Sequence, residues 1–463
     1  MKRLASLDLE RLGVAVALLC GLLAFLPSEM SPDGWYAFLG GDLIVHHGLP
    51  SHDTLTVWGH GRRWVDQQWL AQLSYYGIYA LGGLRLALLV NAGVVAGSFV
   101  WAVRVARGAR RDVLYVSIVG AIALGLSSYA LRPQALVLPL FVAVTWLLVN
   151  DARAPSGRVF WTIPLLVLWA NLHGTVTLGV LLVLLEVAAD AWPRRRPTAR
   201  TSLLSVLAAA SLFASPYALH LSGYYHRVLF NGEFAKYLPD WMPTALAPAT
   251  ACFYLLAFAT VFAIARAPKT LTLFEKAALV VLLVLAVEAT RGVTWFTLFA
   301  LIVLPSALGD LRLPRVSIPE SRAATFVVLF AAVAAVAVAA TRPVSWFARD
   351  YPTSAARAVA DTAGPTGAVF ANAAFSDWLL LKEPSLRGRV AYDARFEVLP
   401  AGRLADAAAV SIGRYDSERI LRPFGVLVLR PEETELRGKL ERDGLWRRVY
   451  ADTKVVVLRR VTE

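Results

Sequence analysis

Three charged side chains have the types that acid–base chemistry and phosphate binding require. Asp33 opens a polar stretch, residues 31–70, that is rich in Trp, His, Asp and Gly. Arg132 and Arg291 each stand in a short polar turn between long apolar runs. A positioned carboxylate can act as a general base, and the planar fork of arginine matches the oxygens of a phosphate group. Together these residues predict proton abstraction beside a bound anionic phosphate.

Each of these side chains also has a simpler interpretation. Asp33 is placed to cap a helix that starts at Trp35, with its carboxylate accepting backbone N–H bonds, although a capping aspartate can still face a cavity. Arg132 and Arg291 can instead extend to lipid headgroups. Glu288 stands one turn before Arg291, where an i,i+3 ion pair is expected to compete with phosphate binding.

Further polar and aromatic side chains fall in the same set of turns. His173 is a third candidate donor to the phosphate. The candidate substrate-binding residues are Asp53, His60, Trp64, Gln134, Asn171, Tyr217, Asp240 and Trp241. Asp53 also fits a turn position, Asn171 fits a helix-terminal cap, and Trp241 fits an interfacial anchor.

Metal-ligand patterns are weak in this sequence. Four histidines stand in or beside the polar stretch: His46, His47, His52 and His60. Adjacent residues on a helix point in different directions, so a preformed zinc site is not favoured. Cys20 and Cys252 both lie in apolar runs, which argues against a disulfide framework or a cysteine metal site. The sequence therefore leaves open whether the protein binds a metal ion.

The composition is that of a polytopic membrane protein. Of the 463 residues, 57% are hydrophobic, and the mean hydropathy is +0.56. The net charge of +13 comes from arginines between the apolar runs, which is typical of cytoplasmic loops and not of a nucleic-acid-binding face. We therefore predict about eleven membrane spans with a cytoplasmic N-terminus. Spans are expected near residues 12–28, 85–103, 113–130, 135–149, 159–172, 201–219, 273–290 and 323–340.

Two parts of the chain are expected. Residues 1–340 form the α-helical membrane domain, and its first extracytoplasmic loop, residues 29–70, begins with a helix at 35–47. This helix and another at 64–81 are expected to lie on the membrane surface. Residues 341–463 are expected to form a small extracytoplasmic α/β domain. Its predicted strands are 367–372, 389–392, 424–429 and 455–459, and its predicted helices are 354–363 and 432–442.

The order of the short motifs resembles that of a known superfamily. After the loop come LRPQ at 131–134, WANLHG at 169–174, SPY at 215–217, PDW at 239–241 and TRG at 290–292. Over about residues 10–310 the chain resembles the GT-C superfamily of polyprenyl-phosphate-sugar-dependent membrane glycosyltransferases, to which bacterial protein O-mannosyltransferases and the lipid A aminoarabinose transferase belong. Oligosaccharyltransferase catalytic subunits are related to them.

The resemblance implies an enzyme of the inner membrane that transfers a sugar from a polyprenyl-phosphate donor. Asp33 matches the acidic residue of the first loop and would act as general base in an inverting transfer to an extracytoplasmic glycan, lipid or protein acceptor. The second acidic residue that the superfamily often has is replaced here by Gly34, which leaves a divalent metal open. Two alternatives remain: a transporter or flippase of a lipid-linked or anionic solute, and a non-catalytic assembly partner with the same fold.

Overall fold

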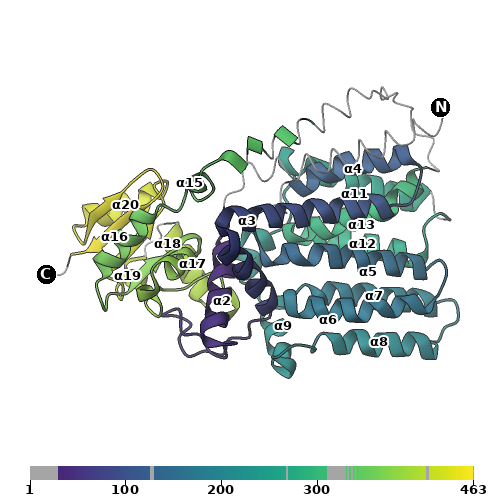
Figure 1. Cartoon of the computed structure of the whole chain (residues 1–463), viewed down its shortest axis with the longest axis horizontal. Coiled ribbons are helices and arrows are strands. Elements are labelled where there is room, and N and C mark those ends of the chain that lie inside the picture. Colours follow the sequence, from purple (N-terminus) through teal and green to yellow (C-terminus); the bar gives the residue numbers. More distant parts are fainter. Residues whose placement is uncertain are drawn as a thin grey trace.

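The computed structural model describes residues 30–125, 130–266, 269–309, 330, 333–334, 337–338, 340–412 and 417–461. The span expected at 12–28, and most of the one expected at 323–340, lie outside the described residues. The described chain forms a bundle of long helices and, at one end of the bundle, a smaller domain of helices and short strands (Figure 1).

The bundle helices run alongside one another (Figure 1). They are α3 (Trp69–Val105), α4 (Arg110–Gly125), α5 (Leu138–Asp151), α6 (Thr162–Leu172), α7 (Val176–Ala191), α8 (Ala199–Ser211), α11 (Ala251–Arg266), α12 (Leu273–Glu288) and α13 (Val293–Leu308). Helix α13 is buried at nearly every position and contacts α3, α4, α5, α11 and α12, so it is the central helix of the bundle.

Helical stretches that can cross a membrane are found throughout the bundle. Four of those within the described residues are long and apolar enough to do so: Trp69–Val105, Pro133–Asp151, Pro248–Arg266 and Thr290–Leu308. Asp112–Leu124 and Gly157–Leu172 are shorter apolar helices. The described chain is mostly helical and has apolar stretches of the kind found in membrane proteins, while the expected number of eleven spans stays a prediction.

A kink divides α3 into two parts. Gly83 has φ 68° and ψ −168°, a conformation that is essentially restricted to glycine. The kink at Gly82 and Gly83 falls between the predicted surface helix at 64–81 and the predicted span at 85–103. The two expected helices are therefore present, joined in one long element that begins at Trp69.

The smaller domain is built on a four-stranded sheet with the order β1-β2-β4-β3. Its strands are β1 (Val369–Ala371), β2 (Val426–Leu429), β3 (Trp446–Ala451) and β4 (Val456–Arg460). Strand β1 pairs in parallel with β2, and the other neighbours pair antiparallel. The domain's helices are α15 (Val344–Phe347), α16 (Thr353–Ala363), α17 (Ala373–Lys382), α18 (Arg403–Ser411), α19 (Ser417–Leu421) and α20 (Thr434–Arg442).

The polar stretch 31–70 extends this sheet. Val57 donates its N–H to the carbonyl of Val390 at 2.8 Å, and Trp58 donates to Ala391 at 3.0 Å. Val390 also forms a bridge with Val369 of β1. The segment predicted as a strand at 389–392 is therefore extended, but it forms only isolated bridges between β1 and the first loop.

One of the hydrophobic clusters is shared by the two parts of the molecule. Helix α2 (Pro32–His47) packs between α3 and α17. Its side chains Trp35 and Phe38 belong to the same buried cluster as Val426 and Val428, which face one side of the sheet. Residues 34–41 of α2 are buried within the protein, so these side chains do not contact lipid, and the expected position of the helix at the membrane surface stays a prediction.

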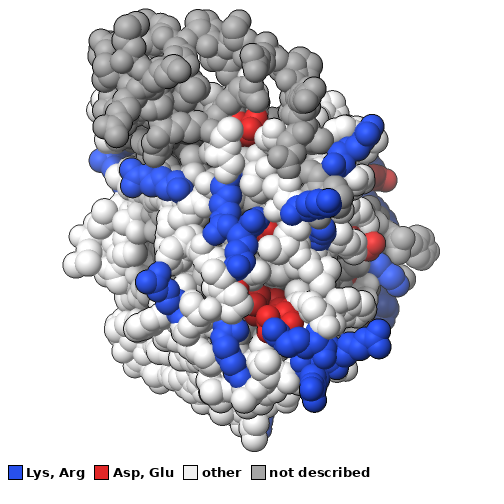
Figure 2. Space-filling view, turned by 90° about the vertical axis from the view of Figure 1, so that its right-hand side faces the viewer, with Lys and Arg blue, Asp and Glu red and all other residues white. Residues whose placement is uncertain are grey.

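Basic side chains collect at the opposite end of the bundle. Figure 2 shows Lys and Arg spread over the end that faces away from the C-terminal domain. Arg107, Arg153 and Arg194 lie in the turns between the helices there, and Arg200 lies in the first turn of α8. Several are tied to acidic partners, as in the pair between Arg200 and Asp151.

Candidate active site

Asp33 lies in the first turn of α2 and is not its cap. The cap is Ser31, whose hydroxyl accepts the N–H of Gly34 at 3.2 Å and donates to the carbonyl of Leu131 at 2.7 Å. The expectation that Asp33 caps a helix beginning at Trp35 was wrong, since the helix begins at Pro32. Ser31 accepts the backbone N–H bond that Asp33 was expected to accept. The Asp33 carboxylate can therefore face the cavity.

Arg132 joins two carboxylates from distant parts of the chain. Its Nε lies 3.3 Å from Asp33 Oδ2 in an ion pair, and its Nη1 donates to Asp240 Oδ2 at 2.5 Å. The extended backbone of Arg132 precedes Pro133, which starts the helical turn that leads into α5. Burial acts to lower the pKa of Arg132, but Asp33 and Asp240 outweigh it and raise the pKa. The guanidinium is thus a permanent cation.

Arg291 stacks on an aromatic side chain of a neighbouring turn. Its guanidinium carbon is 4.3 Å from the ring centroid of Trp241. The two turns, η4 (Pro239–Trp241) and η6 (Thr290–Gly292), are held together by the N–H of Thr290, which donates to Met242 at 3.0 Å. Among the residues that the structure describes, no carboxylate pairs directly with Arg291, and the expected partner Glu288 is exposed.

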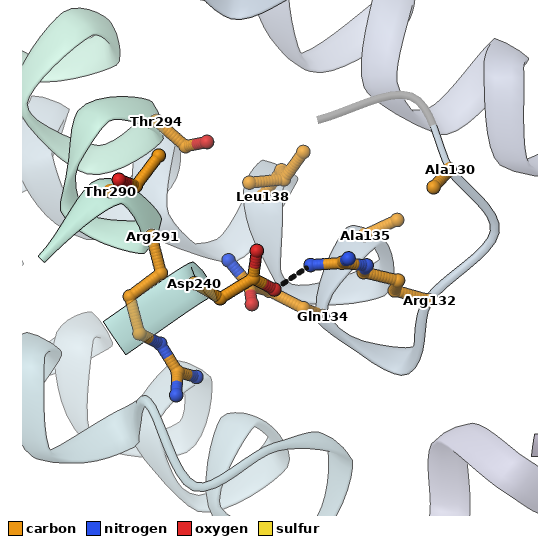
Figure 3. A pocket seen from close by; sticks show the side chains of 9 residues that line it. All are labelled: Ala130, Arg132, Gln134, Ala135, Leu138, Asp240, Thr290, Arg291 and Thr294. Atoms are coloured by element: carbon orange, nitrogen blue, oxygen red, sulfur yellow. Dashed lines mark hydrogen bonds and ion pairs between the residues drawn. The ribbon is translucent and has the colours of Figure 1, made fainter. Parts of the chain in front are cut away.

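Asp240 lies between the two arginines. Figure 3 shows its carboxylate pointing toward Arg132, with Arg291 on the other side. These three side chains, with Gln134, line a small pocket of about 30 Å³ that continues toward Leu138 and Thr294. The pocket thus extends from the polar turns to the first turns of α5 and α13.

His173 is a neutral hydrogen-bonding group in this setting. Burial and, to a smaller extent, the nearby cations Arg291 and Arg132 lower its pKa to about 3. Its Nδ1 accepts the backbone N–H of Thr175 at 3.2 Å, which places the ring proton on Nε2. His173 can therefore donate one hydrogen bond without carrying a charge.

These side chains open onto a larger cavity of about 400 Å³ between the bundle and the C-terminal domain. The lining residues are Pro32, Asp33, Gln68, Arg132, Pro133, Gln134, His173, Tyr224, Val228, Phe234, Leu238, Pro239, Asp240, Trp241, Arg291, Ala373, Ala394, Phe396 and Glu397. Asp33 and Asp240 keep 43% and 48% of their side-chain surface exposed, so a ligand in the cavity can reach both carboxylates.

The structure brings together most of the residues expected at the site. Those in the cavity are Asp33, Arg132, Gln134, His173, Asp240, Trp241 and Arg291. Their roles in binding or catalysis stay predictions.

The remaining candidates lie outside this cavity. His60 is exposed on the first loop. Asn171 accepts from the indole of Trp69 at 3.0 Å and donates to Ala214 at 2.7 Å, and Tyr217 donates to Pro50 at 2.9 Å. Asn171 and Tyr217 thus tie the first loop to the helix ends.

Asp53 and Trp64 also lie outside the cavity, where both contact Arg395. Asp53 accepts from Arg395 Nη2 at 2.6 Å, and the ring of Trp64 lies under the same guanidinium, 4.1 Å from its central carbon. All three side chains are buried. They join the first loop to the C-terminal domain and do not line the cavity.

Several cavity residues were not found from the sequence. Tyr224 comes from α9 (Leu221–Leu229) and Phe234 from α10 (Phe234–Tyr237). Phe396 and Glu397 come from the C-terminal domain. No local pattern marks Glu397, because its place depends on how the C-terminal domain packs on the first loop.

The donor set at the cavity suits an anion better than a bound metal. Two guanidinium groups and a neutral imidazole can meet phosphate oxygens. Among the described residues, no group of three or more His, Cys, Asp or Glu side chains is arranged to hold a metal ion.

Comparisons with known proteins identify the fold. No protein-family model matches the sequence, and no curated protein matches it. The chain is similar to the solved structures of ArnT from Cupriavidus metallidurans, both in the apo state and bound to undecaprenyl phosphate. Each similarity has a TM-score of 0.50 and 14% identity, and covers 97% of this chain and 97% of that chain.

A second similar structure is the archaeal oligosaccharyltransferase AglB from Archaeoglobus fulgidus, in complex with an inhibitory peptide and a dolichol-phosphate. Its TM-score is 0.55 at 11% identity, over 97% of this chain and 74% of that chain. ArnT and AglB are both members of the GT-C superfamily. The protein therefore has the fold of the GT-C membrane glycosyltransferases, which confirms the resemblance seen in the motifs.

Proposed function

We propose that the protein is a membrane glycosyltransferase that takes a sugar from a polyprenyl-phosphate donor and passes it to an acceptor hydroxyl outside the cytoplasm. The observation that carries the proposal is the convergence of Asp33, Arg132 and Arg291 on one cavity. A candidate base and two phosphate-binding cations therefore share the space in which a donor and an acceptor can meet.

The site lies at the end of the bundle where a lipid-linked donor can reach it. In the small pocket, Leu138 and Thr294 belong to the first turns of α5 and α13, next to the turns that carry Arg132 and Arg291. A polyprenyl chain can remain in the bilayer while its phosphate meets the two guanidinium groups. Undecaprenyl phosphate and dolichol-phosphate are bound to the similar structures of ArnT and AglB, which supports a donor of this class.

The charge distribution supports an extracytoplasmic site. The basic turns lie at the opposite end of the bundle (Figure 2), and the positive-inside bias assigns that end to the cytoplasm. The cavity and the C-terminal domain then face the extracytoplasmic side of the inner membrane. The acceptor is a cell-envelope glycan, lipid or protein.

The proposed reaction is a single displacement with inversion. Asp33 accepts the proton of the acceptor hydroxyl while its oxygen forms a bond to the anomeric carbon. The bond from that carbon to the phosphate oxygen breaks, and the lipid phosphate leaves with the electron pair. Arg132 and Arg291 stabilise the charge on the leaving phosphate, and His173 can add a neutral hydrogen bond.

Asp33 and Asp240 both form ion pairs with Arg132. A bound phosphate would compete with both carboxylates for this guanidinium. The competition would release the Asp33 carboxylate next to the leaving group, where the base is needed.

The decisive experiment measures transfer from a panel of undecaprenyl-phosphate sugars by Asp33→Asn, with Asp361→Asn as the matched control. Asp361 is an exposed carboxylate on α16, remote from the cavity lining. We expect transfer to fall by about 100-fold or more in Asp33→Asn only, since general-base help is typically worth that much. Near-normal transfer by a folded Asp33→Asn protein would remove Asp33 from the mechanism.

The same assay separates the alternatives. A wild-type protein that binds undecaprenyl phosphate but turns over no donor would be a non-catalytic partner. A protein that moves the intact lipid-linked sugar across a vesicle membrane, with the glycosidic bond preserved, would be a flippase.

A further inference from the structure

The wall of the cavity that faces Asp33 comes from the C-terminal domain. Ala394, Phe396 and Glu397 line the same cavity as Asp33, Arg132 and Arg291. They belong to the segment 393–397, whose last two residues are part of the short helical turn η8 (Phe396–Val398). This turn also contacts α9 of the bundle, so the C-terminal domain completes the cavity.

A buried ion-pair cluster fixes this segment in place. Arg395 pairs with Asp53 of the first loop at 2.6 Å and with Asp393 at 2.5 Å, and it stacks on Trp64. Its side chain is 1% exposed, and those of Asp53 and Asp393 are 0% and 3% exposed. Such a cluster permits little movement, because any displacement leaves a buried charge unpaired.

The backbone of the segment is held as well. The N–H of Ala394 donates to Asp377 Oδ2 at 3.0 Å, and the N–H of Arg395 donates to Asp393 Oδ1 at 3.0 Å. Asp377 belongs to α17, which packs on α2, the helix that carries Asp33. One chain of contacts therefore positions both Asp33 and Glu397 relative to each other.

Glu397 lines the cavity together with four aromatic side chains, here called the aromatic wall. Tyr224, Phe234, Trp241 and Phe396 line the cavity with it. Among the described residues, no lysine or arginine forms an ion pair with its carboxylate. Aromatic faces and one carboxylate suit a polyhydroxylated ring, whose C–H face is apolar and whose hydroxyls donate hydrogen bonds.

The electrostatic setting of Glu397 agrees with this environment. Burial raises the pKa of Glu397 to about 7, while a hydrogen bond from its own backbone N–H and the charges of Arg395 and Arg227 act to lower it. The carboxyl group has lost part of its contact with water, and a ligand hydroxyl would replace that contact.

We propose that Glu397, supplied by the C-terminal domain, binds the hydroxyls of the sugar carried by the lipid phosphate. This assignment rests on the proposed function and adds the sugar subsite to it. The phosphate is held at the bundle end of the cavity by Arg132 and Arg291, and the sugar lies against the aromatic wall beneath Glu397. The C-terminal domain thus determines which sugar is accepted.

The test compares the binding of a bare lipid phosphate with that of sugar-bearing lipids. Wild type, Glu397→Gln and the control Glu435→Gln are purified as full-length protein in nanodiscs. Glu435 is exposed on α20, away from the cavity. The probes are undecaprenyl phosphate and undecaprenyl phosphates that carry glucose, galactose, mannose or aminoarabinose. Dissociation constants are measured for each pair, and thermal unfolding checks that the variants are folded.

We expect wild type and Glu435→Gln to bind at least one sugar-bearing lipid more tightly than undecaprenyl phosphate. At about pH 8, where the carboxyl group of Glu397 is mostly ionised because its pKa is about 7, this preference should fall by about tenfold in Glu397→Gln, the loss expected when a charged hydrogen-bond acceptor is replaced by a neutral one. Its affinity for bare undecaprenyl phosphate should stay within about twofold, since that probe has no sugar hydroxyl.

Two results would overturn the assignment. One is an unchanged sugar preference in folded Glu397→Gln, and the other is a wild-type protein that binds the bare lipid as tightly as every sugar-bearing one. Binding of bare undecaprenyl phosphate through Arg132 and Arg291 is measured separately in the same experiment. A failure of the Glu397 assignment is therefore distinguishable from a failure of the proposed function.

Discussion

The guanidinium of Arg291 lies over the indole of Trp241, 4.3 Å from the ring centroid. Stacking uses the flat face of the guanidinium and leaves its N–H donors at the edge, facing the cavity. Arg132, by contrast, already has two carboxylate partners. The two arginines therefore differ in what a phosphate must displace, and Arg291 has the more readily available donors.

This difference predicts that Arg291→Lys weakens the binding of undecaprenyl phosphate by about tenfold. Lysine keeps the charge but loses the planar fork and the stacking on Trp241, which is worth about 1 kcal/mol or more. The measurement is equilibrium binding in nanodiscs. Lys236→Gln, an exposed charge removal on α10, serves as the control. Equal affinities for Arg291→Lys and wild type would show that Arg291 acts only as a point charge or not at all.

The cluster around Arg395 gives a second prediction, on stability. Arg395→Met leaves Asp53 and Asp393 buried without their shared cation, so we expect a loss of about 3–5 kcal/mol in unfolding free energy. Limited proteolysis should then cut more readily within the first loop and within the C-terminal domain. Arg357→Met, at an exposed position of α16, should have little effect. A matching stability for the two variants would contradict the structural role of the cluster.

The site residues that the sequence predicts stand in turns between apolar runs, whereas those that it misses depend on contacts between distant parts of the chain. The turns that carry Asp33, Arg132 and Arg291 could be placed at one end because apolar runs and basic turns alternate along the chain. Glu397 has no comparable signal, since it reaches the cavity only when 393–397 packs against the first loop. No sequence pattern indicates that the neighbouring Arg395 contacts Asp53 and Trp64.

The burial of α2 on nearly all sides has a cause that can be read in the sequence. Residues 35–39 read WYAFL, an uninterrupted apolar run. A helix that is apolar on all sides is a buried helix, whereas a helix on a membrane surface needs a polar face. The presence of Trp and His obscured this pattern. Strand β3 was missed because its middle residues are exposed and charged, so it lacks a hydrophobic run.

The kink of α3 predicts opposite effects for two glycines of the same helix. Gly83→Ala should destabilise the protein by about 1–3 kcal/mol, because a side chain at φ 68° and ψ −168° is strained. Gly77→Ala adds a Cβ that meets nothing within 4 Å, and we expect it to be neutral or to stabilise by about 0.5–1 kcal/mol. Thermal unfolding of both variants measures the difference. A destabilised Gly77→Ala beside a normal Gly83→Ala would contradict the observed position of the kink.

His173 makes the stability depend on pH. Its pKa is lowered from 6.5 to about 3 in the folded protein, so the folded state binds fewer protons than the unfolded chain between these values. The contribution of His173 is therefore complete above pH 6.5 and is lost as the pH falls toward 3. We expect wild type to lose more stability than His173→Gln when the pH is lowered from about 7 to about 5.

Activity should respond differently from stability. Because His173 stays neutral above its lowered pKa, no inflection from its protonation should appear in the transfer rate between about pH 5 and pH 8. His173→Gln keeps a neutral donor and should retain the shape of the profile, whereas His173→Leu should lower the rate at every pH. An inflection near pH 6.5 that disappears in His173→Gln would show that the imidazole works in its charged form, which would contradict the neutral hydrogen bond assigned to it.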